Sequence, residues 1–119
     1  MKQNIVAEKS LQLAVRIVNL RNFLVKEKKE YPLSDQILRS GTSIGANIAE
    51  SEYAQSDADF LAKLSISQKE AGETLYWLKL LYTTDYISEV QYDSLRDDTQ
   101  EVLRLLSSII LKLKGKRLP

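Results

Sequence analysis

The 119-residue sequence contains no cysteine and no histidine. Without cysteine the chain has no disulfide framework and no thiolate chemistry. Without histidine it lacks the commonest general base and the commonest metal ligand in proteins. The residues that remain favour a structural or binding role over catalysis.

Proline and glycine are also scarce, with two and four residues respectively. No segment alternates apolar and polar residues in the manner of a half-buried strand. No apolar run approaches the roughly 18 residues that a membrane span needs. The N-terminus lacks the apolar centre of a signal peptide, so we expect a cytoplasmic protein.

Apolar residues recur instead at alternating steps of three and four, which is the spacing of one helical face. In the first segment Leu13, Ile17, Leu20 and Leu24 follow this spacing. The pattern predicts four helices, at about residues 4–30, 33–53, 57–84 and 89–114.

Residues that begin and end helices stand at these boundaries. Ser56 with Asp59, and Ser88 with Gln91, match the pairs that cap a helix N-terminus. Gly115 follows the last helix as an expected C-terminal stop. Because the connections are short, neighbouring helices must be antiparallel. We therefore predict a single all-α domain over residues 1–119, an up-down-up-down antiparallel four-helix bundle.

Gly41 and Gly45 lie inside the second predicted helix, where each glycine costs about 1 kcal/mol relative to alanine. With Ala49 they form a stripe of small residues at steps of four. Such a stripe lets a neighbouring backbone approach closely, and the resulting dispersion contacts offset the cost. A kink or a locally frayed helix is the alternative.

A polar stripe runs beside these glycines. Its members are Gln36, Ser40, Ser43, Asn47 and Glu50. A solvated face explains the stripe on composition alone. Asn47 and Glu50, however, stand among small and apolar residues, where a partly buried pair would need partners. Candidate partners are Arg39, Glu70, Glu73 and other polar groups of the bundle.

The segment "LSDQILRSGTSIGANIAE" resembles the signature of the four-helix-bundle family of 23S rRNA intervening-sequence proteins, L-x-x-Q-x-x-R followed by S-I-x-x-N-I-A-E. The matching residues are Leu33, Gln36, Arg39, Ser43, Ile44, Asn47, Ile48, Ala49 and Glu50. Downstream, Lys69-Glu70-Ala71, Glu73-Thr74 and Tyr76-Trp77-Leu78 are similar to the third helix of that family. Ser51 departs from the pattern, because many members have glycine there.

The resemblance implies four-helix subunits that assemble into a homopentameric ring. One related branch is the accessory protein of diversity-generating retroelements, whose ring binds a reverse transcriptase and nucleic acid. For most members the biochemical role is unknown. We take the following residues as the structural signature: Gln36, Arg39, Gly41, Ser43, Gly45, Asn47, Glu50, Glu70 and Glu73.

The sequence gives little support to a catalytic site or a metal site. A di-iron bundle needs Glu-x-x-His pairs, which a chain without histidine cannot supply. Glu50, Glu70 and Glu73 remain as an all-carboxylate site for a hard cation, with a structural or surface role as the simpler explanation. Ser43 has no base to activate it, and no phosphate-binding glycine loop is present. We predict no enzymatic activity, no cofactor and no metal.

Basic residues concentrate at the two ends of the chain. Formal net charge is only +1, yet the first 30 residues carry seven basic and three acidic side chains, and the last nineteen carry five and one. A bundle of this topology brings both ends of the chain to one end of the molecule. The candidate nucleic-acid-binding residues are Lys2, Lys9, Arg16, Lys112, Lys114, Lys116 and Arg117. Solvated lysines and a loose tail are the alternative.

Residues 31–100 are acidic by contrast, with twelve acidic and five basic side chains. Oppositely charged faces on one subunit suit a head-to-tail contact, which builds a ring if the rotation closes. Tyr76 and Trp77 are candidate interface residues, because aromatic residues are enriched at interfaces. Core packing against the last helix is the alternative for them.

Three functions are compatible with these features. The first is an oligomeric accessory scaffold associated with RNA or DNA, which binds through its basic end. The second is a protein-binding adaptor ring without a nucleic-acid role, which recruits a partner through its acidic and aromatic surface. An uncharacterised enzyme that uses carboxylates is a third.

Overall fold

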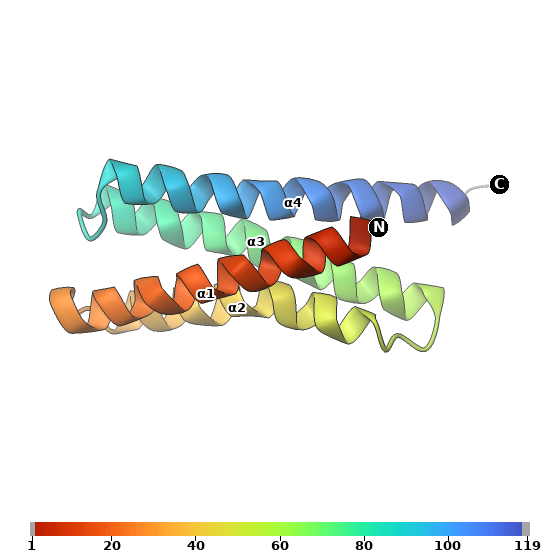
Figure 1. Cartoon of the computed structure of the whole chain (residues 1–119), viewed down its shortest axis with the longest axis horizontal. Helices are drawn as coiled ribbons and strands as arrows, with labels where there is room; N and C mark the ends of the chain where they lie inside the picture. Colours follow the sequence, from red (N-terminus) through yellow and green to blue (C-terminus); the bar gives the residue numbers. More distant parts are fainter. Residues whose placement is uncertain (1, 118–119) are drawn as a thin grey trace.

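The computed structural model describes residues 2–117, and the side chains of residues 5–115. Its four α-helices are α1 (Lys2–Lys28), α2 (Pro32–Ser51), α3 (Asp57–Thr83) and α4 (Glu89–Arg117) (Figure 1). No strand occurs over residues 2–117, which confirms the all-α class. Within the same range, no helix combines the length and the apolar character needed to cross a membrane.

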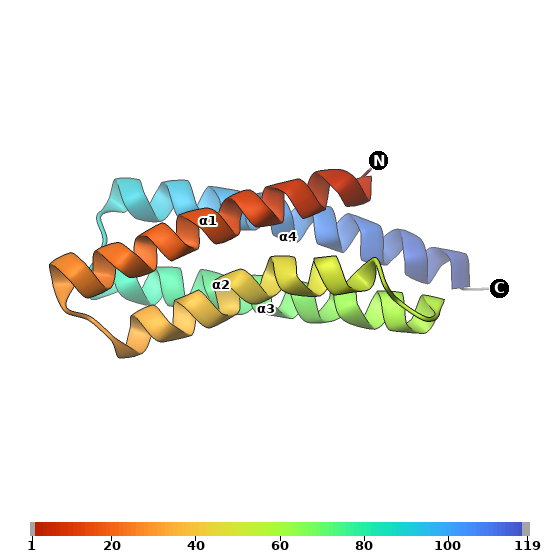
Figure 2. The same cartoon turned by 60° about the horizontal axis from the view of Figure 1, so that its bottom comes forward.

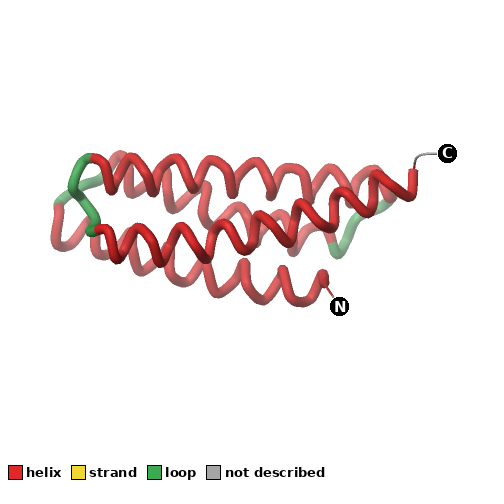
Figure 3. The backbone as a smooth tube through the Cα atoms, turned by 90° about the horizontal axis from the view of Figure 1, so that it is seen from above, coloured by secondary structure: helices red, strands yellow, loops and turns green. Residues whose placement is uncertain are grey.

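The helices form an antiparallel bundle. Consecutive helices lie side by side, and α4 packs against α1 to close the bundle (Figures 1 and 2). Short loops join the helices at the two ends of a molecule that measures 52 × 23 × 21 Å (Figure 3). The start of α1 and the end of α4 lie at the same end, as predicted.

The helix boundaries agree with the predicted ranges to within three residues. Ser56 Oγ accepts a hydrogen bond from the Asp59 N–H at 3.0 Å, so the predicted cap of α3 is confirmed. The predicted cap of α4 is also confirmed, with reciprocal hydrogen bonds of 2.8 and 3.1 Å between Ser88 and Gln91. The predicted stop at Gly115 is wrong, because α4 continues to Arg117 and no positive φ occurs at any of the four glycines, all of which lie in the described range.

Two other residues end helices in the left-handed conformation that usually favours glycine. They are Lys29, with φ 54°, after α1 and Asp85, with φ 67°, after α3. The N–H of Tyr86 binds the Leu81 carbonyl at 2.9 Å, which is the hydrogen bond of a Schellman motif. By contrast, the link after Ser51 contains no residue with positive φ, so serine fits where many family members have glycine.

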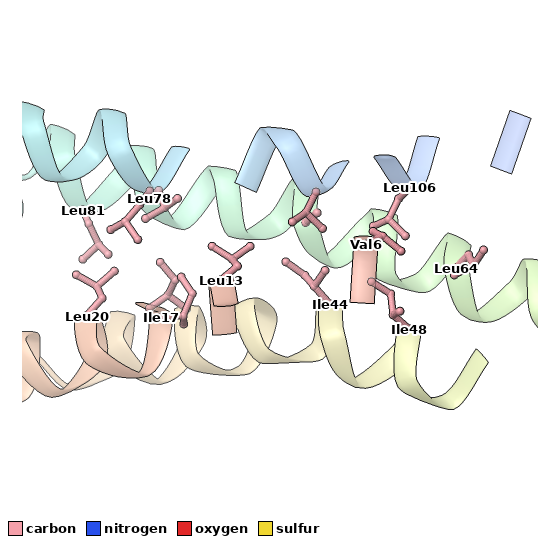
Figure 4. Close-up of a cluster of buried hydrophobic side chains, with 14 of the residues drawn as sticks. Val6, Leu13, Ile17, Leu20, Ile44, Ile48, Leu64, Leu78, Leu81 and Leu106 are labelled. Carbon is pink, nitrogen blue, oxygen red and sulfur yellow. The ribbon is translucent and has the colours of Figure 1, made fainter. Parts of the chain in front are cut away.

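One apolar core runs along the bundle, and all four helices contribute to it (Figure 4). Its fully buried side chains include Leu13, Ile17, Ile44, Leu78 and Leu106. Small hydroxyl residues are buried among them, and they find acceptors on nearby backbone or side chains. Ser67 Oγ, for example, donates to the Ile44 carbonyl at 2.7 Å and joins α3 to α2. The buried serine and threonine hydroxyls are therefore hydrogen-bonded, as buried polar groups usually are.

The glycine stripe of α2 serves a close approach to α1. Gly41 is buried, and a β-carbon there would lie 2.8 Å from two carbons of Ile17. A β-carbon at Gly45 would lie 3.2 Å from Ser10 Oγ. The α-helix is continuous through both residues, so the alternative of frayed structure is wrong. Ala49, the third member of the stripe, is exposed.

Candidate interaction surfaces

Arg39 of α2 gathers several signature side chains across the seam between α2 and α3. Its guanidinium pairs with Glu70 at 3.1 Å and with Glu73, and it lies 3.4 Å from Gln36 Oε1. Glu73 also accepts a hydrogen bond from Trp77 Nε1 at 2.9 Å. We call these five residues the Arg39 cluster. Its carboxylates are paired with a cation of the protein itself, so the cluster joins two helices electrostatically.

Asn47 and Glu50 do not join the Arg39 cluster. The Asn47 amide donates to the Ser43 carbonyl in its own helix at 2.8 Å. Glu50 is exposed, and its Oε1 lies 3.9 Å from Lys63 Nζ. Arg39, Glu70 and Glu73 are therefore wrong as partners of Asn47 and Glu50, and other polar groups of the bundle take that place. Asn47 lies eight residues beyond Arg39, roughly 12 Å further along the helix at 1.5 Å per residue.

The polar stripe of α2 is only partly a solvated face. Ser40 is fully buried, and its hydroxyl lies 3.0 Å from that of Thr74 on α3. Gln36 and Glu50, in contrast, are exposed. Over the described part of the chain, no group of three or more acidic, histidine or cysteine side chains is placed to hold a metal ion.

Lys9 and Arg16, two predicted nucleic-acid contacts, lie in the seam between α1 and α4. Lys9 Nζ is 3.3 Å from Glu101 Oε1, and Arg16 Nη1 is 2.6 Å from Asp98 Oδ2. Arg16 also donates to Ser94 Oγ at 3.0 Å. These partners offset the charge of both residues, although each side chain stays more than a third exposed. Lys9 and Arg16 are thus ion-paired within the subunit, and their contact with nucleic acid stays a prediction.

The other predicted basic residues lie at the ends of α1 and α4. Lys112 and Lys114 are exposed on the last turns of α4. Lys2, Lys116 and Arg117 belong to the same helix ends, but their side chains lie outside the described residues. Figure 1 places the two helix ends at one end of the bundle. We call this region the basic end.

The aromatic pair on α3 divides between core and surface. Trp77 is half-buried against the apolar core, with its Nε1 directed to Glu73 of the Arg39 cluster. Tyr76 is 61% exposed and meets the Trp77 ring edge-on, with centroids 5.2 Å apart. Tyr76 is thus the member available to a partner.

A further surface, which sequence reasoning missed, is the apolar face shared by α1 and α2. Leu11, Val15 and Val18 of α1 are 66%, 54% and 40% exposed. Beside them a groove of about 360 Å³ runs between the helices, lined mainly by small residues. We define the α1–α2 face as Ala7, Leu11, Ala14, Val15, Val18, Thr42, Ala46 and Ala49. The steps of four and three from Leu11 to Val18 were the available signal, a second apolar stripe on a helix whose core stripe is already complete.

Arg21 stands at the edge of this face. It follows Ala7 and Ala14 at steps of seven residues, so the three lie along one line of α1. Arg21 Nε is buried and has no hydrogen-bond acceptor among the described residues. A buried N–H without an acceptor is destabilising.

Comparison with known proteins gives a family and a fold. The model of a family described as 23S rRNA-intervening sequence protein matches residues 2–108. The chain is similar to a protein of unknown function from the S23 ribosomal protein family of Bacteroides thetaiotaomicron, whose crystal structure is known. The two sequences are 62% identical. The similarity covers 92% of this chain and 98% of that chain, with a TM-score of 0.92. No curated protein matches the chain.

Proposed function

Because the chain belongs to the family of 23S rRNA-intervening sequence proteins, we propose that it is a non-catalytic scaffold that forms a homo-oligomer and binds nucleic acid. The α1–α2 face is the observation that carries the proposal. Subunits assemble through this face, and the assembled ring, which we expect to be the pentamer implied for the family, presents its basic ends to nucleic acid.

The apolar character of the α1–α2 face supports assembly. Its eight residues carry no charge, and they include three large side chains that are at least 40% exposed; the charged residue that lines the groove beside them is Glu52. Contiguous apolar patches on a monomer mark interaction sites, since burying a valine or leucine side chain contributes about 1.5–3 kcal/mol. The small residues of the groove between the helices allow a neighbouring helix to approach closely.

Arg21 supports the same interface. Its Nε is buried, but the side chain as a whole is partly exposed. A carboxylate or carbonyl of a neighbouring subunit would form a charge-assisted hydrogen bond with the accessible part of the guanidinium at the edge of the apolar face. A polar group at the rim of an apolar centre is the usual composition of a protein interface.

The basic end supports nucleic-acid binding in the assembled form. The basic end of one subunit offers few cations, and the formal net charge of the chain is only +1. A ring places several basic ends on one surface, and binding at a second end is then intramolecular, which raises the overall affinity. Contacts with a phosphate backbone need only cations and carry no sequence information.

The test of assembly is the mass in solution of two matched variants. Val15→Glu places a charge in the centre of the α1–α2 face and is expected to release a monomer of 13.6 kDa. Gln12→Glu adds the same charge to exposed helix surface outside the face and is expected to keep the parental mass. A Val15→Glu protein that keeps the parental mass overturns the assignment of the interface.

A salt titration with a fluorescent single-stranded RNA tests binding. We expect affinity to fall steeply with salt, and the double variant Lys112→Ala/Lys114→Ala to bind more weakly with a shallower slope. If an intact oligomer binds no RNA or DNA at low salt, nucleic-acid binding is contradicted. The adaptor ring then remains, with Tyr76 and the acidic surface around it as the partner site.

A further inference from the structure

Charge is segregated along α4. Acidic side chains occupy its first half and basic side chains its second half. The acidic residues are Glu89, Asp93, Asp97, Asp98 and Glu101, and the basic residues of the second half with described side chains are Arg104, Lys112 and Lys114. Arg96 is the exception in the first half, where it pairs with Asp93 at 3.2 Å and with Asp97 at 3.1 Å.

One line of α4 faces away from the bundle. Val90, Asp97, Arg104 and Leu111 follow one another at steps of seven and lie opposite the buried line of the helix. Val90 and Leu111 are 79% and 70% exposed. The Asp97 side chain is 66% exposed. From Val90 to Leu111 the side chains along this line are, in order, apolar, acidic, basic and apolar.

We propose that this line is a self-complementary contact, on which α4 of a second copy of the chain lies antiparallel. A two-fold axis between Gln100 and Glu101 opposes Val90 with Leu111 of the second copy, and Leu111 with its Val90. The same axis opposes Asp97 with Arg104, twice. A single alignment thus matches both apolar residues and both charged residues of the outward line.

Neighbouring positions fit the same alignment. Glu89 comes opposite Lys112 of the second copy, so a second kind of ion pair forms at each end of the contact. A shallow groove of about 640 Å³ also lies on this part of α4, lined by Leu103, Arg104, Ser107, Ser108, Leu111 and Lys112. The axis brings the turn from Val90 to Ser94 of the second copy over this groove. Its serines are small and allow the helices to approach closely.

A parallel arrangement of the two helices is disfavoured. It would oppose Asp97 with Asp97 and Arg104 with Arg104, and like charges in contact are destabilising. Antiparallel helices also align their dipoles favourably. The contact is isologous, with the same patch on both copies.

The size of the contact sets its strength. Residues 90–111 span roughly 31 Å at 1.5 Å per residue, and one helix on each side makes the contact. A contact made by one helix on each side covers less surface than the roughly 800 Å² per partner of a standard stable interface. Association is therefore concentration-dependent, and its ion pairs weaken with salt. The α1–α2 face lies on other helices, so the proposal does not rest on assembly through that face.

Cysteine cross-linking tests the alignment directly, because the natural chain has no cysteine. Val90→Cys and Leu111→Cys proteins are mixed at low salt and treated with a short bis-maleimide. We expect the mixture to give a covalent dimer, and each variant alone to give at least tenfold less. In the antiparallel pair, two copies of the same position are roughly 31 Å apart. A mixture of Val90→Cys with Tyr53→Cys, which is 84% exposed, measures random collision.

A second experiment exchanges the charges of the proposed ion pair. Adding Arg104→Asp to both cysteine proteins opposes acidic residues and is expected to lower the yield of dimer at least tenfold. Adding Asp97→Arg as well restores opposite charges and is expected to restore the yield. The proposal is overturned if the Val90→Cys and Leu111→Cys mixture yields no more dimer than random collision, if single variants cross-link equally well, or if Arg104→Asp has no effect.

Discussion

Gly41 of α2 lies directly against Ile17 of α1, so that a β-carbon on Gly41 would be 2.8 Å from both Cγ1 and Cγ2 of Ile17. Ile17 is fully buried and branched at its β-carbon, which leaves it little freedom to turn away. The absence of a side chain at this position therefore sets how closely the first two helices of the bundle pack. Their spacing in turn shapes the α1–α2 face.

Replacing each helical glycine by alanine should give a graded series. Gly41→Ala is expected to lower the free energy of unfolding by about 1–2 kcal/mol, because overpacking outweighs the gain in helix propensity. Gly45→Ala should be close to neutral, since the nearest atom is the hydroxyl of Ser10, 3.2 Å away. Gly72→Ala should stabilise by about 0.5–1 kcal/mol, because nothing lies within 4 Å. Urea unfolding measures all three, and a Gly41→Ala protein as stable as Gly72→Ala contradicts the close packing.

Glu30 is expected to hold the start of α2. Its carboxylate is buried and accepts hydrogen bonds from the N–H groups of Leu33 at 3.1 Å and Ser34 at 2.7 Å. These N–H groups have no partner within the helix. Glu30→Ala should therefore lower the free energy of unfolding by about 1–3 kcal/mol. Glu30→Gln keeps an acceptor oxygen and should cost less, and equal stability of Glu30→Ala and the parent in urea would refute this role.

Lys29→Gly is expected to stabilise the protein. Lys29 has a φ of 54°, where a side chain costs roughly 1–2 kcal/mol. Glycine removes that cost but adds freedom to the unfolded chain, so the net gain should be about 0.5–1 kcal/mol. Lys26→Gly, inside α1, provides the control and should destabilise by about 1 kcal/mol. Thermal unfolding compares the two, and a Lys29→Gly protein that unfolds earlier than the parent would contradict the left-handed geometry.

The Tyr82 hydroxyl is expected to lose its proton at a higher pH than an ordinary tyrosine. The negative charge of Glu89, whose Oε2 is 3.3 Å from the phenol oxygen, is the main cause that raises the pKa of Tyr82 above its ordinary value of 10.0, followed by desolvation. The associated stability is present below the unfolded pKa and is lost as pH rises through the raised folded pKa. Glu89→Gln should lower the pKa of Tyr82 in an NMR titration, whereas the remote change Glu8→Gln should leave it unaltered.

The helices and two of their caps could be predicted from the sequence because both depend on local spacing. The steps of three and four fix the buried line of each helix, and Ser88 with Gln91 needs only its own turn. The ends at Lys29 and Asp85 could not be predicted in this way, since neither residue favours the left-handed conformation. The predicted stop at Gly115 was wrong because glycine can end a helix but is also tolerated inside one.

The candidate surfaces depended on partners distant in sequence. Arg16 looks basic by itself, but Asp98, 82 residues away, offsets its charge across the α1–α4 seam. Arg39 pairs with Glu70 and Glu73 because of the register between α2 and α3. The spacing of residues within one helix does not predict that register. The α1–α2 face is visible in the sequence from Leu11 to Val18, but its extension across α2 required the relative placement of two helices.

The mass of the Arg104→Asp protein in solution tests the central claim most directly, because this change removes the proposed α4 contact and leaves the α1–α2 face intact. Sedimentation equilibrium at low micromolar concentration should give an oligomer whose mass is a multiple of 13.6 kDa. A folded, helical protein that sediments as a 13.6 kDa monomer would contradict assembly through the α1–α2 face.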